Sequence, residues 1–208
     1  MKLPNSINRF LQDERGLAAE FALVLPLLII FVLGTIDIGI YAYRLNQAEK
    51  ATQMGARYAV VTNPVWQELT TLSMVNKNVN GTDVTQGDRI PVMDFTVTCD
   101  DTACTCAGPN CGLVGTQTRD AAAFTNLATR MRVIAPGIQD ANIEVDYSGS
   151  GLGYAGDPNG PDISPFVTVR LTGLEYTPIS LAVFGSKIGF GDFTYTLTAE
   201  DAAGTNSN

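Results

Sequence analysis

The chain of 208 residues contains no histidine, and only 16% of its residues carry a charge. Without histidine, the protein lacks the side chain that most often acts as a general base and as a neutral metal ligand. The sequence also has no phosphate-binding glycine loop, no nucleophile elbow and no C-x-x-C pair. We therefore predict that the protein is not an enzyme and uses no metal and no cofactor.

Clusters of basic residues are missing as well, and the net charge is −8. From residue 45 onward the chain carries 17 acidic and 9 basic residues. An acidic domain repels the phosphate backbone of DNA and RNA. We therefore expect no nucleic-acid partner.

One long stretch has almost no charge, and it is strongly apolar. Residues 21–36 are 16 uncharged residues, and continuing through Asp37 to Tyr43 gives 23. A helix of about 20 mostly apolar residues spans a bilayer, so the stretch predicts a transmembrane helix. Residues 1–16 have a net charge of +1, and the other flank leads into the acidic domain. The positive-inside rule then places the N-terminus in the cytoplasm.

Two simpler interpretations of this stretch remain open. A secretory signal peptide has a basic tail and an apolar core, but this apolar run is longer and no A-x-A cleavage site follows it. A simple membrane anchor explains the apolar run but not Glu20, because a carboxylate close to the hydrocarbon is costly unless it is paired or faces water.

Glu20 has two explanations of its own. In the milder one, its carboxylate points to cytoplasmic water at the membrane surface. In the other, a peptidase cuts after Gly16 and leaves a positive amine at Leu17, close to the carboxylate. In an assembly of such helices, the Glu20 of one subunit would pair with the amine of the next.

Two stretches, ERGLAAEFALVLPLL and LNQAEKATQMGARYAVV, resemble the TadE-like family of the tight-adherence (Flp) pilus system. One departure is that Glu20 is the fourth residue after Gly16, where the family usually has its glutamate as the fifth. The matching residues are Arg15, Gly16, Glu20, Phe21, Ala22, Leu23, Pro26, Gly55, Ala56, Arg57 and Tyr58.

The resemblance implies a minor pilin or pseudopilin, which is a structural and assembly component of a bacterial type IV-type pilus that supports surface adhesion. It implies cleavage by a prepilin peptidase between Gly16 and Leu17, with Glu20 as the charge partner during assembly. It also implies contacts with other pilin subunits through the N-terminal helix and with the assembly platform of the inner membrane. The alternative is a permanently anchored bitopic protein with a periplasmic binding or adhesion domain.

The sequence thus predicts three parts. Residues 1–16 form a cytoplasmic leader-like tail, residues 17–63 a transmembrane helix that continues outside the cytoplasm, and residues 64–208 an outer domain. We expect a single-pass protein of the bacterial inner membrane, with its C-terminal domain in the periplasm or, after assembly, in an extracellular pilus. The predicted helix runs from about residue 18 to residue 61, and its expected packing positions are Phe21, Pro26, Gly34, Gly39 and Gly55.

Asp37 is a second acid in the apolar helix, two turns before Arg44. Our favoured interpretation places it at the level of the outer headgroups. The alternative is an interaction with Arg44 through intervening side chains, or with a base of a neighbouring subunit.

The outer domain shows an α+β pattern. A short helix is expected within residues 64–76, and a helix over residues 118–133 with Phe124, Leu127 and Met131 on one face. The expected strands lie within residues 90–99, 141–149, 164–176 and 190–201. We predict a pilin-like α+β fold in which a long N-terminal helix accompanies an antiparallel sheet and a smaller helix.

All four cysteines lie in one predicted loop, residues 99–111, with the spacing C-x4-C-x-C-x4-C. Outside the cytoplasm they are expected to form two disulfides, although the sequence leaves three connectivities open. A bond between Cys104 and Cys106 would be strained. A zinc site built from Cys99, Cys104, Cys106 and Cys111 is the alternative, but the usual C-x2-C knuckles are missing.

A second loop, GYAGDPNGPDISP, brings together Asp157, Asn159 and Asp162. Oxygen ligands at such spacing can hold calcium, but the rest of an EF-hand loop is missing. The same residue types are common in turns, and a plain connecting loop is the favoured interpretation.

Overall fold

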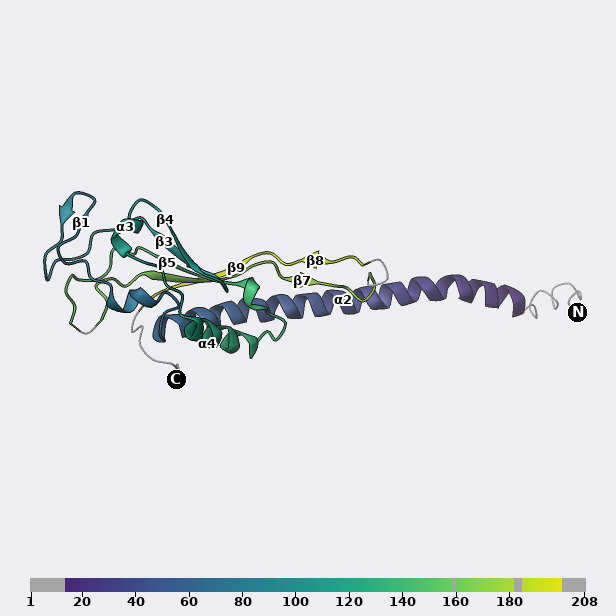
Figure 1. Cartoon of the computed structure of the whole chain (residues 1–208). Helices are drawn as coiled ribbons and strands as arrows, with labels where there is room; N and C mark the ends of the chain where they lie inside the picture. The colour runs from purple at the N-terminus through teal and green to yellow at the C-terminus, as the bar shows by residue number, and fades with distance from the viewer. Residues whose placement is uncertain (1–13, 159, 182–184, 200–208) are drawn as a thin grey trace, which may run out of the picture. The chain divides into compact units, whose positions relative to one another are not determined.

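The computed structural model describes residues 14–158, 160–181 and 185–199 (Figure 1). Most of the predicted leader-like tail therefore lies outside the described residues. The chain divides into two compact units. Unit 1 holds Met1–Tyr43 and Tyr176–Ile188, and unit 2 holds Arg44–Glu175 and Gly189–Asn208.

The longest element is helix α2 (Glu14–Val61), with 48 residues (Figure 1). It begins before the predicted start at residue 18, since nothing in the sequence Glu-Arg-Gly-Leu interrupts a helix. Pro26 lies inside it. From Leu27 to Val61 the sequence contains no proline, which lets the helix continue from the apolar stretch into unit 2 without a break.

In unit 2, five strands form one antiparallel sheet in the order β4-β3-β5-β6-β9. Their bounds are β3 (Thr96–Cys99), β4 (Cys104–Ala107), β5 (Ile143–Ser148), β6 (Phe166–Leu171) and β9 (Phe193–Thr198). In β6, buried Val167 and Val169 alternate with more exposed neighbours. Val169 faces Val145 of β5 on one side and Tyr195 of β9 on the other. The period of two buries one face of the sheet and leaves the other open to solvent.

The shorter elements join these strands. They are η1 (Gln67–Thr71), β1 (Asn78–Val79), β2 (Thr82–Asp83), α3 (Cys111–Val114), α4 (Ala121–Arg132), η2 (Asp140–Asn142), β7 (Glu175–Tyr176) and β8 (Ile188–Gly189). The predicted helix of residues 64–76 is present only as the 3-10 turn η1, because the backbone becomes extended at Leu72. The strand expected over residues 90–99 pairs only from Thr96, after Pro91, which has no N–H to donate.

Helix α4 closes the core of unit 2. Its first turn is capped by Asp120, whose carboxylate accepts hydrogen bonds from the backbone N–H groups of Ala122 and Ala123. Phe124, Leu127 and Met131 are all buried, which confirms the face predicted for this helix. The helix is held at its end as well as at its start.

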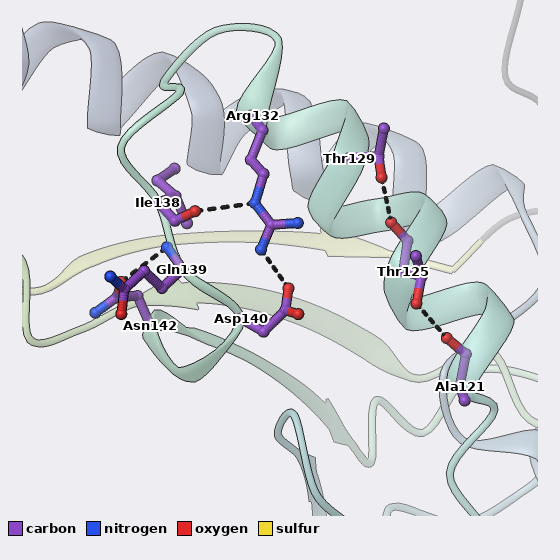
Figure 2. Close-up of polar contacts among 8 residues, drawn as sticks. All are labelled: Ala121, Thr125, Thr129, Arg132, Ile138, Gln139, Asp140 and Asn142. Atoms are coloured by element: carbon purple, nitrogen blue, oxygen red, sulfur yellow. Dashed lines mark hydrogen bonds and ion pairs between the residues drawn. The ribbon is translucent and has the colours of Figure 1, made fainter.

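Figure 2 shows how the end of α4 is fixed to the following turn. The Nε of Arg132 donates to the carbonyl of Ile138 at 2.9 Å, and its Nη2 pairs with the carboxylate of Asp140. The N–H of Gln139 donates to the side-chain oxygen of Asn142 at 3.0 Å. The positive charge of Arg132 near the C-terminus of the helix also interacts favourably with the helix dipole.

The largest fully buried side chain described in unit 2 is that of Trp66, with 0% exposure. Its ring lies 6.1 Å from that of Tyr147 and 6.3 Å from that of Phe95, measured between centroids. Its Nε1 donates to the carbonyl of Thr116 at 3.0 Å. The hydroxyl of Tyr147 accepts from the N–H of Val65, so the polar atoms of this cluster have partners.

The cysteine stretch is more regular than the predicted loop, because it contains strand β4 and the helical turn α3. Cys99 and Cys104 are direct cross-strand neighbours and form one disulfide, and Cys106 and Cys111 form the other. The turn between them is closed by Asp100, whose carboxylate accepts from Thr102 and Ala103. The structure thus selects one of the three connectivities and confirms two disulfides.

Together, the long apolar N-terminal helix, the antiparallel five-stranded sheet and the smaller helix α4 make an α+β, pilin-like fold. This confirms the fold class that the sequence predicts. The strand candidates within residues 141–149, 164–176 and 190–201 are present as β5, β6 with β7, and β9.

Candidate functional site

In unit 1, the apolar part of α2 presents nearly all of its large side chains outward. It is long and apolar enough to cross a membrane, with a mean hydropathy of 2.6 over its most apolar window. The side chains of Leu27 and Phe31 are 64% and 72% exposed. Other exposed apolar residues of this part are Phe21, Leu23, Val24, Leu25, Leu28, Ile29, Ile30, Val32, Ile36 and Ile38. A helix segment that exposes apolar side chains on all sides, uncovered by the described part of the chain, is suited to lipid or to neighbouring helices, not to water.

The residues predicted for processing lie at the start of this helix. Gly16 and Glu20 are both exposed. Leu17 lies in the same helical turn, and its side chain is outside the described set. After a cut between Gly16 and Leu17, the new amine and the Glu20 carboxylate would be three residues apart. Residues three apart lie on the same helix face.

Four of the predicted packing positions contact little of the described part of their own chain. Phe21 is 63% exposed. Among the described residues, no atom outside the helix's own backbone lies within 4 Å of a Cβ built on Gly34 or on Gly39. Pro26 is exposed too. These positions are therefore available to partners other than the chain itself.

Gly55 has a different environment, inside unit 2. A Cβ built on it would lie 2.8 Å from the Sδ of Met131 in α4. Ala51 and Ala56 of the same helix are completely buried. The small residues in this part of α2 let α4 approach closely, and this contact lies within one chain, not between subunits.

Asp37 has partners that neither interpretation of the sequence anticipated. Its side chain belongs to unit 1, and the residue is only 6% exposed. Its Oδ1 accepts hydrogen bonds from the Tyr176 hydroxyl at 2.8 Å and the Ile179 N–H at 2.7 Å, and its Oδ2 accepts from the Ser180 N–H at 2.8 Å. Asp37 therefore does not simply face headgroups, because it fastens the segment 176–181 of its own chain to α2.

The same segment makes an aromatic contact with the helix. The rings of Tyr41 and Tyr176 lie 6.0 Å apart between centroids, at an angle of 55°. Tyr176 and Pro178 are buried, whereas Ile179 is 51% exposed. One sequence signal indicated this segment: the run from Tyr176 to Ser186 contains no charged residue. The sequence did not show where the run would dock.

Asp162, a residue of the proposed calcium loop, is also used internally. It is 3% exposed, and its two oxygens accept from the N–H groups of Met74, Gly156 and Asp157 and from the Ser73 hydroxyl. Its lone pairs thus organise a turn, which supports the plain-loop interpretation. Asn159 lies outside the described residues. Within the described part of the chain, no group of three or more His, Cys, Asp or Glu residues is arranged to hold a metal ion.

Glu68 is a second acid that ties two segments of unit 2 together. Its Oε2 accepts from the N–H of Thr118 at 2.8 Å and its Oε1 accepts from the Thr116 hydroxyl at 3.0 Å. Partial burial raises the pKa of Glu68, but the hydrogen bonds from Thr118 and Thr116 outweigh it and lower the pKa below its ordinary value of 4.5. The ionised form is therefore the one that the fold stabilises.

Comparison with known proteins gives one match. Residues 17–57 match the family model described as TadE-like protein. No curated protein and no solved structure matches the chain. The matched range covers residues 17–28 and 45–57 of the two stretches that carry the resemblance, including Glu20 and Gly55 but not Gly16 or Tyr58. Over residues 17–57 the chain is similar to the TadE-like family.

Proposed function

We propose that this protein is a minor pilin or pseudopilin of a tight-adherence pilus. It is inserted in the inner membrane by the apolar part of α2, is cut by a prepilin peptidase between Gly16 and Leu17, and then joins other pilin subunits through that helix. The single observation that carries the proposal is the TadE-like match over residues 17–57.

The exposed apolar surface of α2 supports this role. A membrane protein that is later extracted into a fibre needs a helix that is stable first in lipid and then against neighbouring helices. From Phe21 to Val32 every residue of the helix is exposed in the described structure, and the small residues Gly34 and Gly39 follow. Small residues let helices approach each other closely where no hydrophobic effect drives them together.

The exposed position of Glu20 supports the assembly step. Alone in lipid, the carboxylate is costly. Next to the new amine of Leu17 on a neighbouring subunit, it becomes part of an ion pair in a low-dielectric environment, where removing one partner is costly. Assembly would therefore depend on Glu20, whereas membrane insertion would not.

The outer domain would be the part displayed in the periplasm or on the fibre. Two disulfides hold the hairpin of β3 and β4 and the turn that follows it. Disulfides persist in oxidising compartments, which agrees with a domain outside the cytoplasm.

The first experiment determines the N-terminal residue of the mature protein. We would isolate the protein from membranes of cells that contain a prepilin peptidase, and measure its intact mass and terminal sequence. The variant Gly16→Val should block cleavage, and Gly39→Val is the matched control, because both glycines have open space around their Cβ positions. We expect Leu17 as the first residue in wild type and in the control, and Met1 in Gly16→Val.

A wild-type chain that still begins at Met1 would contradict processing. It would favour the permanently anchored protein with a periplasmic binding or adhesion domain. A second variant, Glu20→Gln, separates the two steps: we expect normal membrane insertion but loss of co-isolation with other pilin subunits. Equal co-isolation of Glu20→Gln and wild type would remove the assembly role of this residue.

A further inference from the structure

Unit 1 contains a pocket between α2 and the segment that Asp37 holds. Its volume is about 510 Å³. Helix α2 contributes four residues to its wall, and the rest of unit 1 contributes five. The lining residues are Gly34, Asp37, Ile38, Tyr41, Tyr176, Pro178, Ser180, Leu181 and Ile188.

The polar groups of the wall are already engaged with one another. Both oxygens of Asp37 accept hydrogen bonds from the chain, and the donors include the Tyr176 hydroxyl and the Ser180 N–H. What the pocket offers to an occupant is therefore mostly the apolar surface of Ile38, Leu181 and Ile188. Such a wall suits a hydrocarbon group, because a polar ligand would lose its bonds to water without replacing them.

The pocket is also continuous with the exposed apolar surface of the helix. Ile38 is 71% exposed, and Leu181 and Ile188 on the opposite wall are 39% and 41% exposed. The surface from Phe21 to Ile36 continues along the same helix toward the pocket. Between Phe21 and Ile36 the one polar side chain is that of Thr35, and its hydroxyl donates to the Val32 carbonyl at 2.8 Å.

We propose that this pocket holds an acyl chain of a membrane phospholipid. The proposal rests on the proposed function only in requiring that α2 be inserted in a bilayer. Pockets that bind small ligands have volumes of about 300–1,000 Å³, so the space is of a suitable size for such a chain. Asp37 is the positioning residue, because it holds the segment that forms the second wall.

Gly34 provides a way to test the pocket without disturbing the fold. It lines the pocket, and among the described residues nothing outside the helix's own backbone lies within 4 Å of its Cβ position. A larger side chain at residue 34 would therefore start from an open Cβ position in the wall of the pocket and occupy part of its space. Gly39 has equally open surroundings but does not line the pocket, which makes Gly34→Phe and Gly39→Phe a matched pair.

The experiment uses the full chain in vesicles of phosphatidylethanolamine and phosphatidylglycerol, with a small fraction of phosphatidylglycerol that carries a photoactivatable diazirine on its acyl chain. After illumination, peptide mass spectrometry locates the lipid adducts. Leu27 is 64% exposed, so adducts there report insertion of the helix in the bilayer. Tyr176 is 4% exposed, so adducts there report a chain inside the pocket.

We expect adducts at both Leu27 and Tyr176 in wild type and in Gly39→Phe. In Gly34→Phe, the adducts at Tyr176 should fall several-fold while those at Leu27 stay the same. The proposal is overturned if Tyr176 carries no adducts while Leu27 does, or if Gly34→Phe leaves the adducts at Tyr176 unchanged. Adducts at Leu27 test membrane insertion, which the proposed function requires. Their absence would therefore contradict insertion, not only the lipid in the pocket.

A second copy of the chain is the competing occupant. Chemical crosslinking of the same vesicles distinguishes it, because a helix of a neighbouring subunit in the pocket would give crosslinks between two chains at Ile38 or Leu181. If such crosslinks form in wild type and in Gly39→Phe but are lost in Gly34→Phe, the occupant of the pocket is a neighbouring subunit. That result would overturn the proposal.

Discussion

The two ends of helix α2 differ more in their environment than in their backbone. In the first part, large apolar side chains such as Leu27 and Phe31 are more than half exposed. In the second part, Ala51 and Ala56 are completely buried within unit 2. The helix is uninterrupted, but its side chains change along its length. The first part carries large apolar residues on all sides, and the second part has small residues on the side that is buried in unit 2. Side-chain size and pattern, not helix propensity, decide which part joins the core of the outer domain.

We expect the largest difference in stability between variants of two leucines, one in each environment. Leu127 of α4 is 1% exposed, and Leu27 of α2 is 64% exposed. Leu127→Ala should lower the free energy of unfolding of the outer domain by about 2–5 kcal/mol, since it leaves a cavity in a packed core. Leu27→Ala should leave that value unchanged. The measurement is denaturant unfolding in detergent micelles, followed by the fluorescence of Trp66, the only tryptophan.

An equal loss of stability in both leucine variants would contradict the comparison. It would mean that the apolar part of α2 is packed as tightly as the core of unit 2. The full chain is used for both variants, so the micelle and the tryptophan reporter are the same.

The next effect compares two glycines of the same helix. Gly55→Leu should lower the free energy of unfolding by about 1–3 kcal/mol, because its new side chain would overlap Met131. Gly39→Leu should have almost no effect on the outer domain, because the space around its Cβ position is open. The double variant Gly55→Leu with Met131→Ala should recover part of the loss, and the absence of any recovery would contradict a direct overlap.

A local effect is expected at Asp37. Asp37→Ala removes the acceptor of three hydrogen bonds, and a buried donor left without a partner costs about 1–3 kcal/mol. Amide exchange at Ile179 and Ser180 should become faster by about tenfold or more, since about 1.4 kcal/mol corresponds to a factor of ten. Hydrogen exchange by mass spectrometry measures this, and the unfolding transition of Trp66 should stay unchanged.

Asp37→Asn is the conservative control for this prediction. Its single carbonyl oxygen keeps one acceptor, so exchange should lie between wild type and Asp37→Ala. Exchange rates at Ile179 and Ser180 that are the same in all three proteins would show that Asp37 does not hold the segment.

The smallest effect is the contribution of Glu68 to the pH dependence of stability. Its pKa is lowered in the folded state, so its stabilising effect is present above the ordinary value of 4.5 and is lost as the pH falls through the lower folded value. Glu68→Gln should therefore reduce the loss of stability between neutral and acidic pH. Denaturant unfolding of both proteins at several pH values measures this, and parallel pH profiles would contradict the assignment.

The local elements were predictable from the sequence because their signals are local. The apolar run without proline predicts α2, and the alternation of Phe193, Thr194 and Tyr195 predicts β9. The buried face of α4 follows from the spacing of Phe124, Leu127 and Met131. Each of these patterns depends on residues only a few positions apart, which is the range over which helix and strand periodicity acts.

The candidate site was only partly predictable for the opposite reason. The residues of the TadE-like pattern can be read from the sequence, and the family match over residues 17–57 covers those from Glu20 to Arg57. The partners of Asp37 lie 139 to 143 residues further along the chain, and no local pattern connects them. The position of Asp37 at the level of the outer headgroups stays a prediction, and the segment that buries Asp37 was not anticipated because it is distant in sequence.

The sequence by itself determined the apolar N-terminal helix, the α+β class and the acidic outer domain, since composition and short-range periodicity suffice for them. Tertiary structure alone decided that Cys99 pairs with Cys104, that Gly55 lies against Met131, and that Asp37 binds the segment 176–181. These contacts depend on which surfaces meet once the chain has collapsed. A buried polar group is then satisfied by the donors that the fold brings to it, because a buried polar group without a partner costs free energy.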